Sequence, residues 1–487
     1  MKKALLSSIT TLLVFAGGAF AVNPTLEWKM DVAEELPVIT RGVDALISPT
    51  AGAVLNIVIR KHKDPDSVYS TSILTHAADD GELLSSDVKN IGGKHTTAKG
   101  ACIGQNGDII TAGSWYNGTN TVFWTAGYRP QPHGWLWDIV NETSQMEQAS
   151  KVVTDEYGSI YVIGNTWSAE TGADIVIHKY DSDRNHVWNT TIIEEGDDYA
   201  YGLDAFKVVS TKRLYLALER RKAADDCHTF IYDLSSETGI LDPARTLKFG
   251  LRLNFGEVYP SGARYAKKSS YQAADDLFYI AGTLDDGEDK DFWLACCDYE
   301  GNYIWEKTFD GGHNDWANAI ALGFGYVYAA GTSNNGTDND CRVIRYDEAG
   351  NESWNITYGA AGDQGLSAIC LDPAGNFYVT GYTGDVEADS LQELVIKYSQ
   401  PDVTGIEEQP SSPPSVTLEI IGDFTSAPTI LYSIPRGQHE ILTFYAVDGR
   451  KIESFALDET GSDFSWNAST LPSGVYFARL SCGGNTV

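Results

Sequence analysis

A unit of about 50 residues recurs along this 487-residue chain, and this period constrains the fold more than any other feature. Residues 149–164 and 367–381 share one order: a strand-like segment, an Asp-x-x-Gly turn, a second strand-like segment and a glycine. The glycine recurs at intervals of 51, 118, 49 and 50 residues, the longest covering two units: Gly113, Gly164, Gly282, Gly331 and Gly381. A single unit of short strands cannot bury both of its faces, so successive units must pack against one another.

The second half of the unit carries an Asp and a Trp seven residues apart, at positions 181 and 188, 298 and 305, and 347 and 354. Each unit therefore holds four short strands, named a, b, c and d in chain order. The 12 Trp, 26 Tyr and 47 Gly against three Met favour strands and tight turns over long helices. Four strands in a period of this length are typical of a β-propeller, so we predict an all-β fold.

The last unit lacks one strand, and this gap predicts how the ring closes. Units are expected near residues 40–90, 97–140, 147–193, 200–248, 260–309, 315–358 and from 366 to 398. The last one has no Trp-bearing strand d, whereas residues 26–30, around Trp28, match that strand at the other end of the chain. We predict a seven-bladed β-propeller closed by this N-terminal strand, with residues 394–398 as its partner and no open edge. Six or eight blades stay open, because the first and fourth units are weak.

These segments resemble the seven-bladed β-propeller repeat family of secreted bacterial proteins. Its Asp-x-x-Gly-Asn-x-Tyr-Val-x-Gly core matches residues 372–381, and its Tyr-Asp-x-x-Gly-Asn-x-x-Trp tail matches residues 346–354. The fourth unit departs from the pattern, since residues 214–218 contain no marker glycine. The resemblance covers residues 26–399 and implies the fold, not an activity, because propellers carry many unrelated functions.

The N-terminal residues have the order of a secretory signal peptide. Lys2 and Lys3 precede an apolar run over residues 4–16, and the small-residue site Ala19-Phe20-Ala21 follows. We expect cleavage after Ala21 and a secreted or cell-surface protein. The apolar run is shorter than the ~20 residues that span a bilayer, so no transmembrane segment is expected in the mature chain.

A net charge of −32 argues against nucleic acid as a partner.

The C-terminal part predicts a second, smaller domain. Residues 401–416 contain Pro and Ser without apolar periodicity and predict a linker, whereas residues 417–487 alternate between apolar and polar positions, as in a small Ig-like β-sandwich. Residues 404–408, 431–435, 445–452 and 471–480 are similar to the C-terminal sorting domain of the type IX secretion system of diderm bacteria. The resemblance implies the type IX translocon as a partner, although residues 481–487 do not match the family's final basic, apolar strand. The alternative is an ordinary structural sandwich. The predicted domains are therefore the signal peptide (1–21), propeller (22–400), linker (401–416) and sorting-like sandwich (417–487).

Motifs for catalysis or cofactor binding are not found in the sequence. It contains no HExxH, GxSxG or Walker motif, and its nine His and seven Cys show no metal-ligand or CxxC spacing. Catalytic residues, a cofactor and a metal are therefore not predicted. Residues 181–185 resemble the start of a calcium loop, but a solvated turn is the favoured interpretation. Asp174, Asp291 and Asp340 recur at one position of the unit, which favours a structural role over a catalytic pair.

The loops between strands b and c and between d and the next a share one face of a propeller, and this face is the predicted ligand-binding surface. Its loops are longer than the tight turns on the other face and are rich in aromatic, Asp and Asn residues. The candidate residues are Trp115, Tyr116, Trp167, Asp197, Asp198, His313, Asp315 and Trp316. We predict a surface module that binds glycan or protein rather than an enzyme, with an extracellular polysaccharide hydrolase or lyase as the alternative. A third interpretation is that Trp115, Trp167 and Trp316 only pack between blades.

Overall fold

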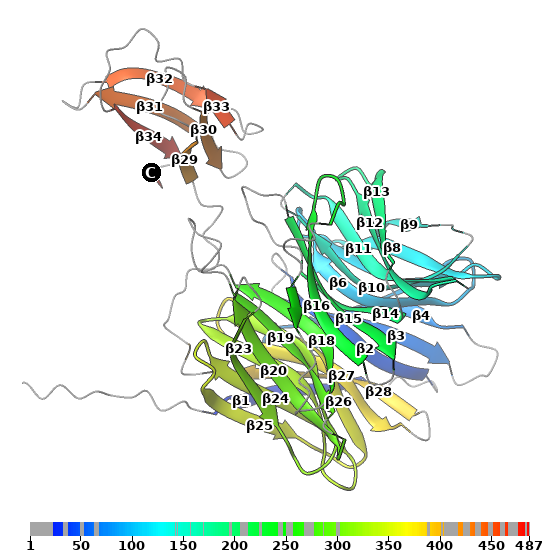
Figure 1. Cartoon of the computed structure of the whole chain (residues 1–487). Coiled ribbons are helices and arrows are strands. Elements are labelled where there is room, and N and C mark those ends of the chain that lie inside the picture. Colours follow the sequence, from blue (N-terminus) through cyan, green and yellow to red (C-terminus); the bar gives the residue numbers. More distant parts are fainter. Residues whose placement is uncertain are drawn as a thin grey trace, which may run out of the picture. The chain divides into compact units, whose positions relative to one another are not determined.

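A computed structural model describes the chain in two compact units, residues 1–404 and residues 405–487 (Figure 1). The described residues are 23–32, 38–48, 53–62, 68–141, 143, 145–155, 157–168, 170–193, 197–204, 213–223, 226–241, 247–249, 257–266, 277–285, 287–298, 302–386, 390–400, 403, 417–421, 429–433, 440–446, 451–457, 463–465, 476–482 and 485–486. The predicted signal peptide, residues 1–21, and nearly all of the predicted linker, residues 401–416, lie outside them. Within these ranges no helix is both long and apolar enough to cross a membrane.

Six sheets of unit 1 are each built from four consecutive antiparallel strands. The first three sheets are β2 (Val38–Ile47), β3 (Ala53–His62), β4 (Ser70–Ala77) and β5 (Leu83–Lys89); β6 (Thr96–Ile103), β7 (Ile109–Tyr116), β8 (Thr121–Pro130) and β9 (His133–Val140); and β10 (Met146–Thr154), β11 (Ile160–Ser168), β12 (Gly172–Tyr180) and β13 (His186–Ile192). The next three are β14 (Asp197–Asp204), β15 (Arg213–Ala223), β16 (Asp226–Ser235) and β17 (Leu247–Phe249); β18 (Glu257–Ala266), β19 (Leu277–Asp285), β20 (Lys290–Asp298) and β21 (Tyr303–Phe309); and β22 (Asp315–Gly323), β23 (Tyr326–Asn334), β24 (Asn339–Asp347) and β25 (Glu352–Tyr358).

A further sheet is composed from both ends of unit 1. It contains β26 (Asp363–Leu371), β27 (Phe377–Asp385), β28 (Ser390–Ser399) and then β1 (Thr25–Val32). β1 lies antiparallel to β28, with Trp28 opposite Lys397 and Met30 opposite Val395. The predicted pairing of the N-terminal strand with strand c of the last unit is therefore confirmed, and this composite sheet occupies the place of that unit.

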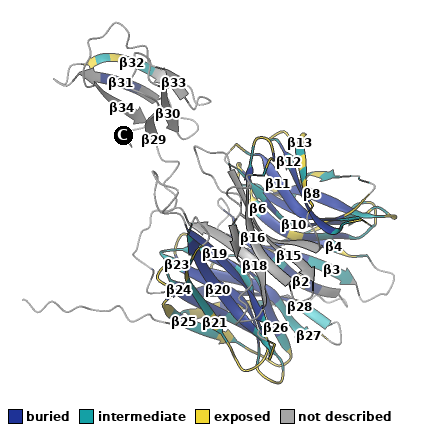
Figure 2. Cartoon of the chain, viewed as in Figure 1, coloured by how far each residue is buried: buried dark blue, intermediate teal, exposed yellow. Residues whose placement is uncertain are grey.

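The sheets pack in a circle. The first strand of each sheet contacts the preceding sheet: β6 packs on β2 to β4, β10 on β6 to β8, β14 on β10 to β12, β18 on β14 to β16, β22 on β18 to β20, and β26 on β22 to β24. β2 in turn packs on β26, β27 and β28 of the composite sheet, which completes the circle. The middle strands are largely buried between neighbouring sheets, as Figure 2 shows for β8, β12, β20 and β24.

The marker glycines are explained by a bulge that every first strand carries against its second strand. The register shifts between Ala317 and Ala319 in β22, for example, and at the equivalent place in the other sheets. A Cβ on Gly331 would lie 1.8 Å from the carbonyl oxygen of Trp316, well inside contact distance. A Cβ would likewise lie 1.8 to 1.9 Å from a carbonyl oxygen of the first strand at Gly113, Gly164 and Gly381. A side chain at these positions is therefore excluded by the backbone of the first strand.

The Asp of the Asp-to-Trp interval closes the turn between strands c and d. Oδ1 of Asp347 accepts a hydrogen bond from the backbone N of Asn351 at 2.8 Å, and its Oδ2 accepts one from Asn351 Nδ2 at 2.9 Å. Asp298 and Asp181 are held by the equivalent asparagines at 2.8 to 3.0 Å. Both oxygens of Asp181 are therefore occupied by amide donors, which supports the turn interpretation over the calcium loop.

The Trp of the interval joins one sheet to the next. The indole of Trp305 lies over Gly350 in the next c–d turn, where a Cβ would lie 2.7 Å from the ring, and its Nε1 donates to the carbonyl of Glu348 at 2.9 Å. Trp188 and Trp28 make the same contacts with the turns that hold Gly239 and Gly81. The indole of Trp28 thus joins the composite sheet to the first sheet.

Unit 2 contains two small sheets. One has the order β29 (Thr417–Ile421), β30 (Thr429–Ser433) and β33 (Asp463–Ser465). The other has the order β32 (Lys451–Leu457), β31 (Glu440–Ala446), β34 (Tyr476–Cys482) and β35 (Asn485–Thr486). Leu442 and Phe444 on β31 are buried. The unit begins at residue 405, within the segment predicted as a linker. The sandwich and its sorting role remain predictions.

Candidate ligand-binding face

The eight predicted ligand residues lie at one end of their sheets but in four different sheets. Second strands end and first strands begin at this end: Trp115 and Tyr116 on β7, Trp167 on β11, Asp197 and Asp198 on β14, and Asp315 and Trp316 on β22, with His313 just before β22. The side chains of Asp197 and Asp198 lie outside the described set. Among the other six, no described contact joins residues of different sheets, so the structure does not gather them into one site.

An exposed aromatic cluster, Tyr69, His95 and Tyr116, forms the best-defined feature of this face. The ring centroids of Tyr69 and His95 are 5.5 Å apart, and those of His95 and Tyr116 are 6.2 Å apart. His95 is held in place because its Nδ1 accepts from the backbone N of Tyr69 at 3.1 Å and its carbonyl accepts from the backbone N of Tyr116 at 3.0 Å. Tyr69 and Tyr116 remain 37% and 38% exposed. The rings are therefore fixed and accessible to a ligand.

Basic and amide groups surround the aromatic cluster. The ammonium of Lys61 lies 5.2 Å from the centroid of the Tyr69 ring, a cation–π distance. Lys94 Nζ donates to the carbonyl of Asn117, whose own Oδ1 accepts from two backbone N–H groups of its loop. Sequence reasoning found Tyr116 but missed Tyr69 and His95, which lie on two separate loops and belong to no repeated pattern.

Trp115 supports the packing interpretation. Its indole is half-buried against the core of the first two sheets, and Nε1 donates to the carbonyl of Ile91 at 3.0 Å. Trp167 and Trp316 are also only partly exposed. The exposed ring next to Trp115 is Tyr116, so Tyr116 is the better candidate for ligand contact.

An acidic group lies on the same face between the sheets of β18–β21 and β22–β25. Carboxylate oxygens of Asp289, Asp291 and Asp310 lie within 4.8 Å of one another, as the oxygen ligands of a hard cation do. Nearby, Asp315 is fully buried, accepts from the backbone N of Gly311 at 2.7 Å, and has its pKa raised by burial. His313 is exposed and lies against Gly336 of the adjoining loop.

Two of the three repeated aspartates hold their own b–c loops. Asp174 accepts from the hydroxyl of Thr171, and Asp340 Oδ2 accepts from Asn335 Nδ2 at 3.0 Å. These contacts support the structural interpretation for Asp174 and Asp340. Asp291 occupies the same place in its sheet but belongs to the acidic group.

Glu147 and His178 form a buried pair between the second and third sheets. Asn141 Nδ2 lies 3.2 Å from both Glu147 Oε2 and His178 Nε2, and the two side chains are 3.9 Å apart. Burial raises the pKa of Glu147 to about 7 and, together with repulsion from His186, lowers the pKa of His178 to about 4. Both groups are thus neutral between these values, so their contact is a polar one and not an ion pair.

The contribution of Glu147 to stability should fall as the pH rises from about 4.5 to about 7. The carboxyl of Glu147 ionises near pH 4.5 in the unfolded chain but near 7 in the folded one, so the unfolded state releases its proton first and is favoured as the pH rises. Replacing Glu147 by Gln should stabilise the protein by roughly 2 kcal/mol at pH 8 and have little effect at pH 4.5. Urea unfolding at both pH values measures this. The exposed Glu82→Gln change is the control, and equal effects of the two changes would contradict the assignment.

The circle of four-stranded sheets defines unit 1 as a β-propeller. No protein-family model and no curated protein matches the chain. Among solved structures, Sqt1 from Chaetomium thermophilum bound to the N-terminus of ribosomal protein L10 is 9% identical, covering 77% of this chain and 100% of that one with a TM-score of 0.43. A protein of unknown function from Dyadobacter fermentans is 10% identical, covering 77% and 99% with a TM-score of 0.43. The β-propeller domain of the Trilobed protease from Pyrococcus furiosus is 11% identical, covering 74% and 97% with a TM-score of 0.41.

Proposed function

We propose that this chain is an exported seven-bladed β-propeller that binds a carbohydrate through the face bearing the b–c and d–a loops. The aromatic cluster carries the proposal. Its exposed rings can stack on the apolar face of a sugar, while neighbouring amide and ammonium groups can hydrogen-bond the sugar hydroxyls. The composite sheet supports the count of seven, because it takes the place of the last repeat.

Binding should be lost when the exposed rings of the cluster are removed. A glycan array probed with the purified protein identifies a ligand, and calorimetry then compares the native protein with a Tyr69→Ala/Tyr116→Ala variant. We expect affinity to fall at least about tenfold, since each ring contributes on the order of 1 kcal/mol by stacking. Tyr157→Ala is the matched control, because Tyr157 is 54% exposed in an a–b turn on the opposite face.

Two results would contradict the carbohydrate proposal. One is a glycan whose affinity is unchanged in the double variant. The other is a protein ligand that needs the same rings while no glycan binds, which would make the face a protein-binding surface. Thermal unfolding of each variant shows whether the propeller itself is intact.

Export is the second part of the proposal. It is supported by the signal-peptide order of residues 1–21 and by the resemblance of residues 417–487 to a type IX sorting domain. In a host with this system, the full chain should reach the medium or the cell surface, and a chain without residues 405–487 should stay in the periplasm. Cell fractionation with immunoblotting measures this, and equal export of both chains would show that unit 2 is not the address.

A polysaccharide hydrolase or lyase is not favoured by the described residues. Of the repeated aspartates that a catalytic pair could use, Asp174 and Asp340 are engaged by hydroxyl or amide groups of their own loops. Such contacts fix loop shape, and a general acid or base needs instead to reach the substrate proton.

A further inference from the structure

Two cationic side chains occupy neighbouring first strands near the axis of the ring. Arg41 lies on β2 two residues before the bulged Val43, and Lys99 is the bulged residue of β6, between Ala98 and Gly100. β2 and β6 pack directly on each other, and both side chains are exposed to solvent. The first strands begin at the face with the d–a loops, so both positions can be approached from the proposed binding face.

An aromatic ring orients Arg41. The guanidinium carbon lies 5.1 Å from the centroid of the Tyr382 ring, which belongs to β27 of the composite sheet. The ring of Tyr382 can lie against β26 because residue 365 of that strand is glycine. A Cβ on Gly365 would lie 2.8 Å from the Tyr382 ring. A guanidinium that rests on an aromatic ring keeps its N–H edge available for a planar oxyanion.

Arg41 and Lys99 repel each other, and no carboxylate among the described residues pairs with either. The pKa of Lys99 is lowered by burial and further by the charge of Arg41, so protein surrounds part of this side chain although the residue is exposed to solvent. In a chain of net charge −32, these two adjacent cations are not paired with an anion among the described residues.

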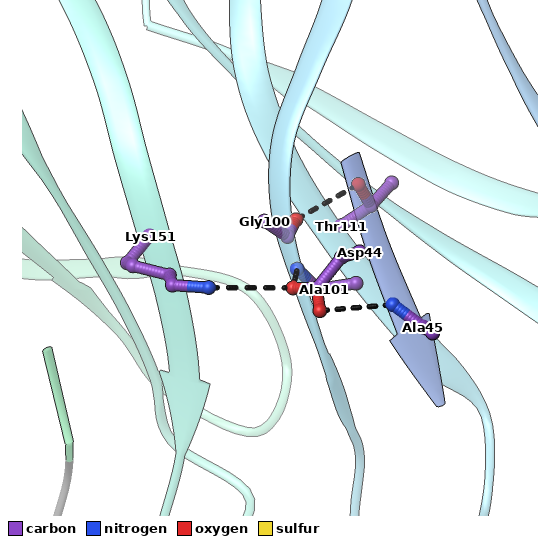
Figure 3. A network of polar contacts seen from close by, with 6 residues as sticks. All are labelled: Asp44, Ala45, Gly100, Ala101, Thr111 and Lys151. Carbon is purple, nitrogen blue, oxygen red and sulfur yellow. Dashed lines mark hydrogen bonds and ion pairs between the residues drawn. The ribbon is translucent and has the colours of Figure 1, made fainter. Parts of the chain in front are cut away.

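Lys151, which lies beside Gly100, differs from Lys99 in having a carboxylate partner. Figure 3 shows Lys151 of β10 directed at the carboxylate of Asp44, with Nζ 3.5 Å from Oδ2, while the same carboxylate accepts from the backbone N of Ala101 at 2.9 Å and from that of Ala45 at 3.0 Å. Asp44 is thus engaged by one lysine and two backbone donors. The repulsion between Arg41 and Lys99 is not compensated in this way.

We infer that Arg41 and Lys99, with Tyr382, form a binding site for an oxyanion, a carboxylate or sulfate group. The guanidinium supplies a fork of two N–H donors and the ammonium adds a point charge, and an anion between them replaces their repulsion with attraction. The oxyanion has two sources that share this chemistry. It is a free small anion, or it is the acid group of a saccharide held on the loop face, in which case the inference rests on the proposed function.

Calorimetry with sodium sulfate against sodium chloride at matched ionic strength tests the site on the full chain. The Arg41→Gln/Lys99→Gln variant should bind sulfate at least about tenfold more weakly than the native protein, because each charged hydrogen bond contributes about a tenfold factor. The Lys29→Gln/Lys89→Gln variant removes the same charge from outer strands and should stay within about twofold. Without sulfate the site variant should unfold at the same or a higher temperature, since it removes a repulsion.

A second titration separates the two sources. If tri-galacturonate binds more tightly than sulfate, and both the site variant and Tyr69→Ala/Tyr116→Ala weaken it, the oxyanion belongs to a saccharide. If sulfate binds at the site and no saccharide does, the site stands with a free anion as its ligand, and the carbohydrate proposal fails. Equal affinity of the native protein and the site variant for both probes would overturn the site, as would the absence of binding to either.

Discussion

A chain without residues 22–34 should fail to form a closed ring and should aggregate. The deletion removes all of β1, which leaves the hydrogen-bonding edge of β28 unpaired. Exposed strand edges pair with other chains, so oligomers and precipitate are the expected products. The deletion also removes Trp28, the buried link between the composite sheet and the first sheet. Size-exclusion chromatography with light scattering measures the oligomers, and a monomer with native-like unfolding would contradict closure by β1.

A point variant tests the same closure without removing the strand. Trp28→Ala should destabilise the propeller by about 3–5 kcal/mol, the usual cost of truncating a buried Trp. Trp28 is 9% exposed and donates to the carbonyl of Ala78 at 3.3 Å. Leu26→Ala is the control on the same strand, because Leu26 is 41% exposed. Similar losses in the two variants would show that the strand, and not the Trp contact, holds the ring together.

The sequence predicts the features of this fold that repeat, because every unit faces the same packing problem. The Asp-to-Trp interval is visible in the sequence since each sheet must close a c–d turn and join the next one. The residue that each Trp contacts cannot be predicted from the sequence. Trp305 reaches Gly350 of the following sheet only because the sheets pack in a circle. In the first and fourth sheets, Val58 and Leu218 occupy the position that the marker glycine has in other sheets, opposite the bulge. These two units therefore match the sequence repeat poorly.

Features that bind a ligand are harder to predict from the sequence because they break the repeat. Tyr69 and His95 lie on loops of unequal sequence in two successive units, and only the packing of those units brings the rings together. Arg41 and Lys99 are likewise single departures at positions where other units carry different residues. Conversely, the predicted Trp115 and Trp167 lie near the ends of the second strands in two successive sheets, and such regularity is what packing between blades produces.

Gly331→Ala should be among the most destabilising single-methyl changes in the described part of the propeller. The added Cβ would lie 1.8 Å from the carbonyl oxygen of Trp316, and this oxygen belongs to backbone that cannot rotate away. The strand must shift instead, which would disturb the bulge beside it. Asn318, the bulged residue, donates to the carbonyl of Leu366 in the next sheet at 2.9 Å, so the strain would reach a contact between blades. We expect a loss of roughly 3 kcal/mol or more, at the upper end for overpacked cores.

Gly325→Ala separates this steric effect from the general cost of replacing a glycine. Gly325 has a φ of 75°, in the left-handed region, and a Cβ added there would meet no atom within 4 Å. Alanine at this position therefore carries only the conformational cost, about 1–2 kcal/mol. Chemical unfolding of both variants gives the comparison. A clearly larger loss of stability in Gly331→Ala assigns the marker glycine to the close approach of the bulged strand, whereas equal losses in the two variants would mean that the carbonyl of Trp316 can move aside.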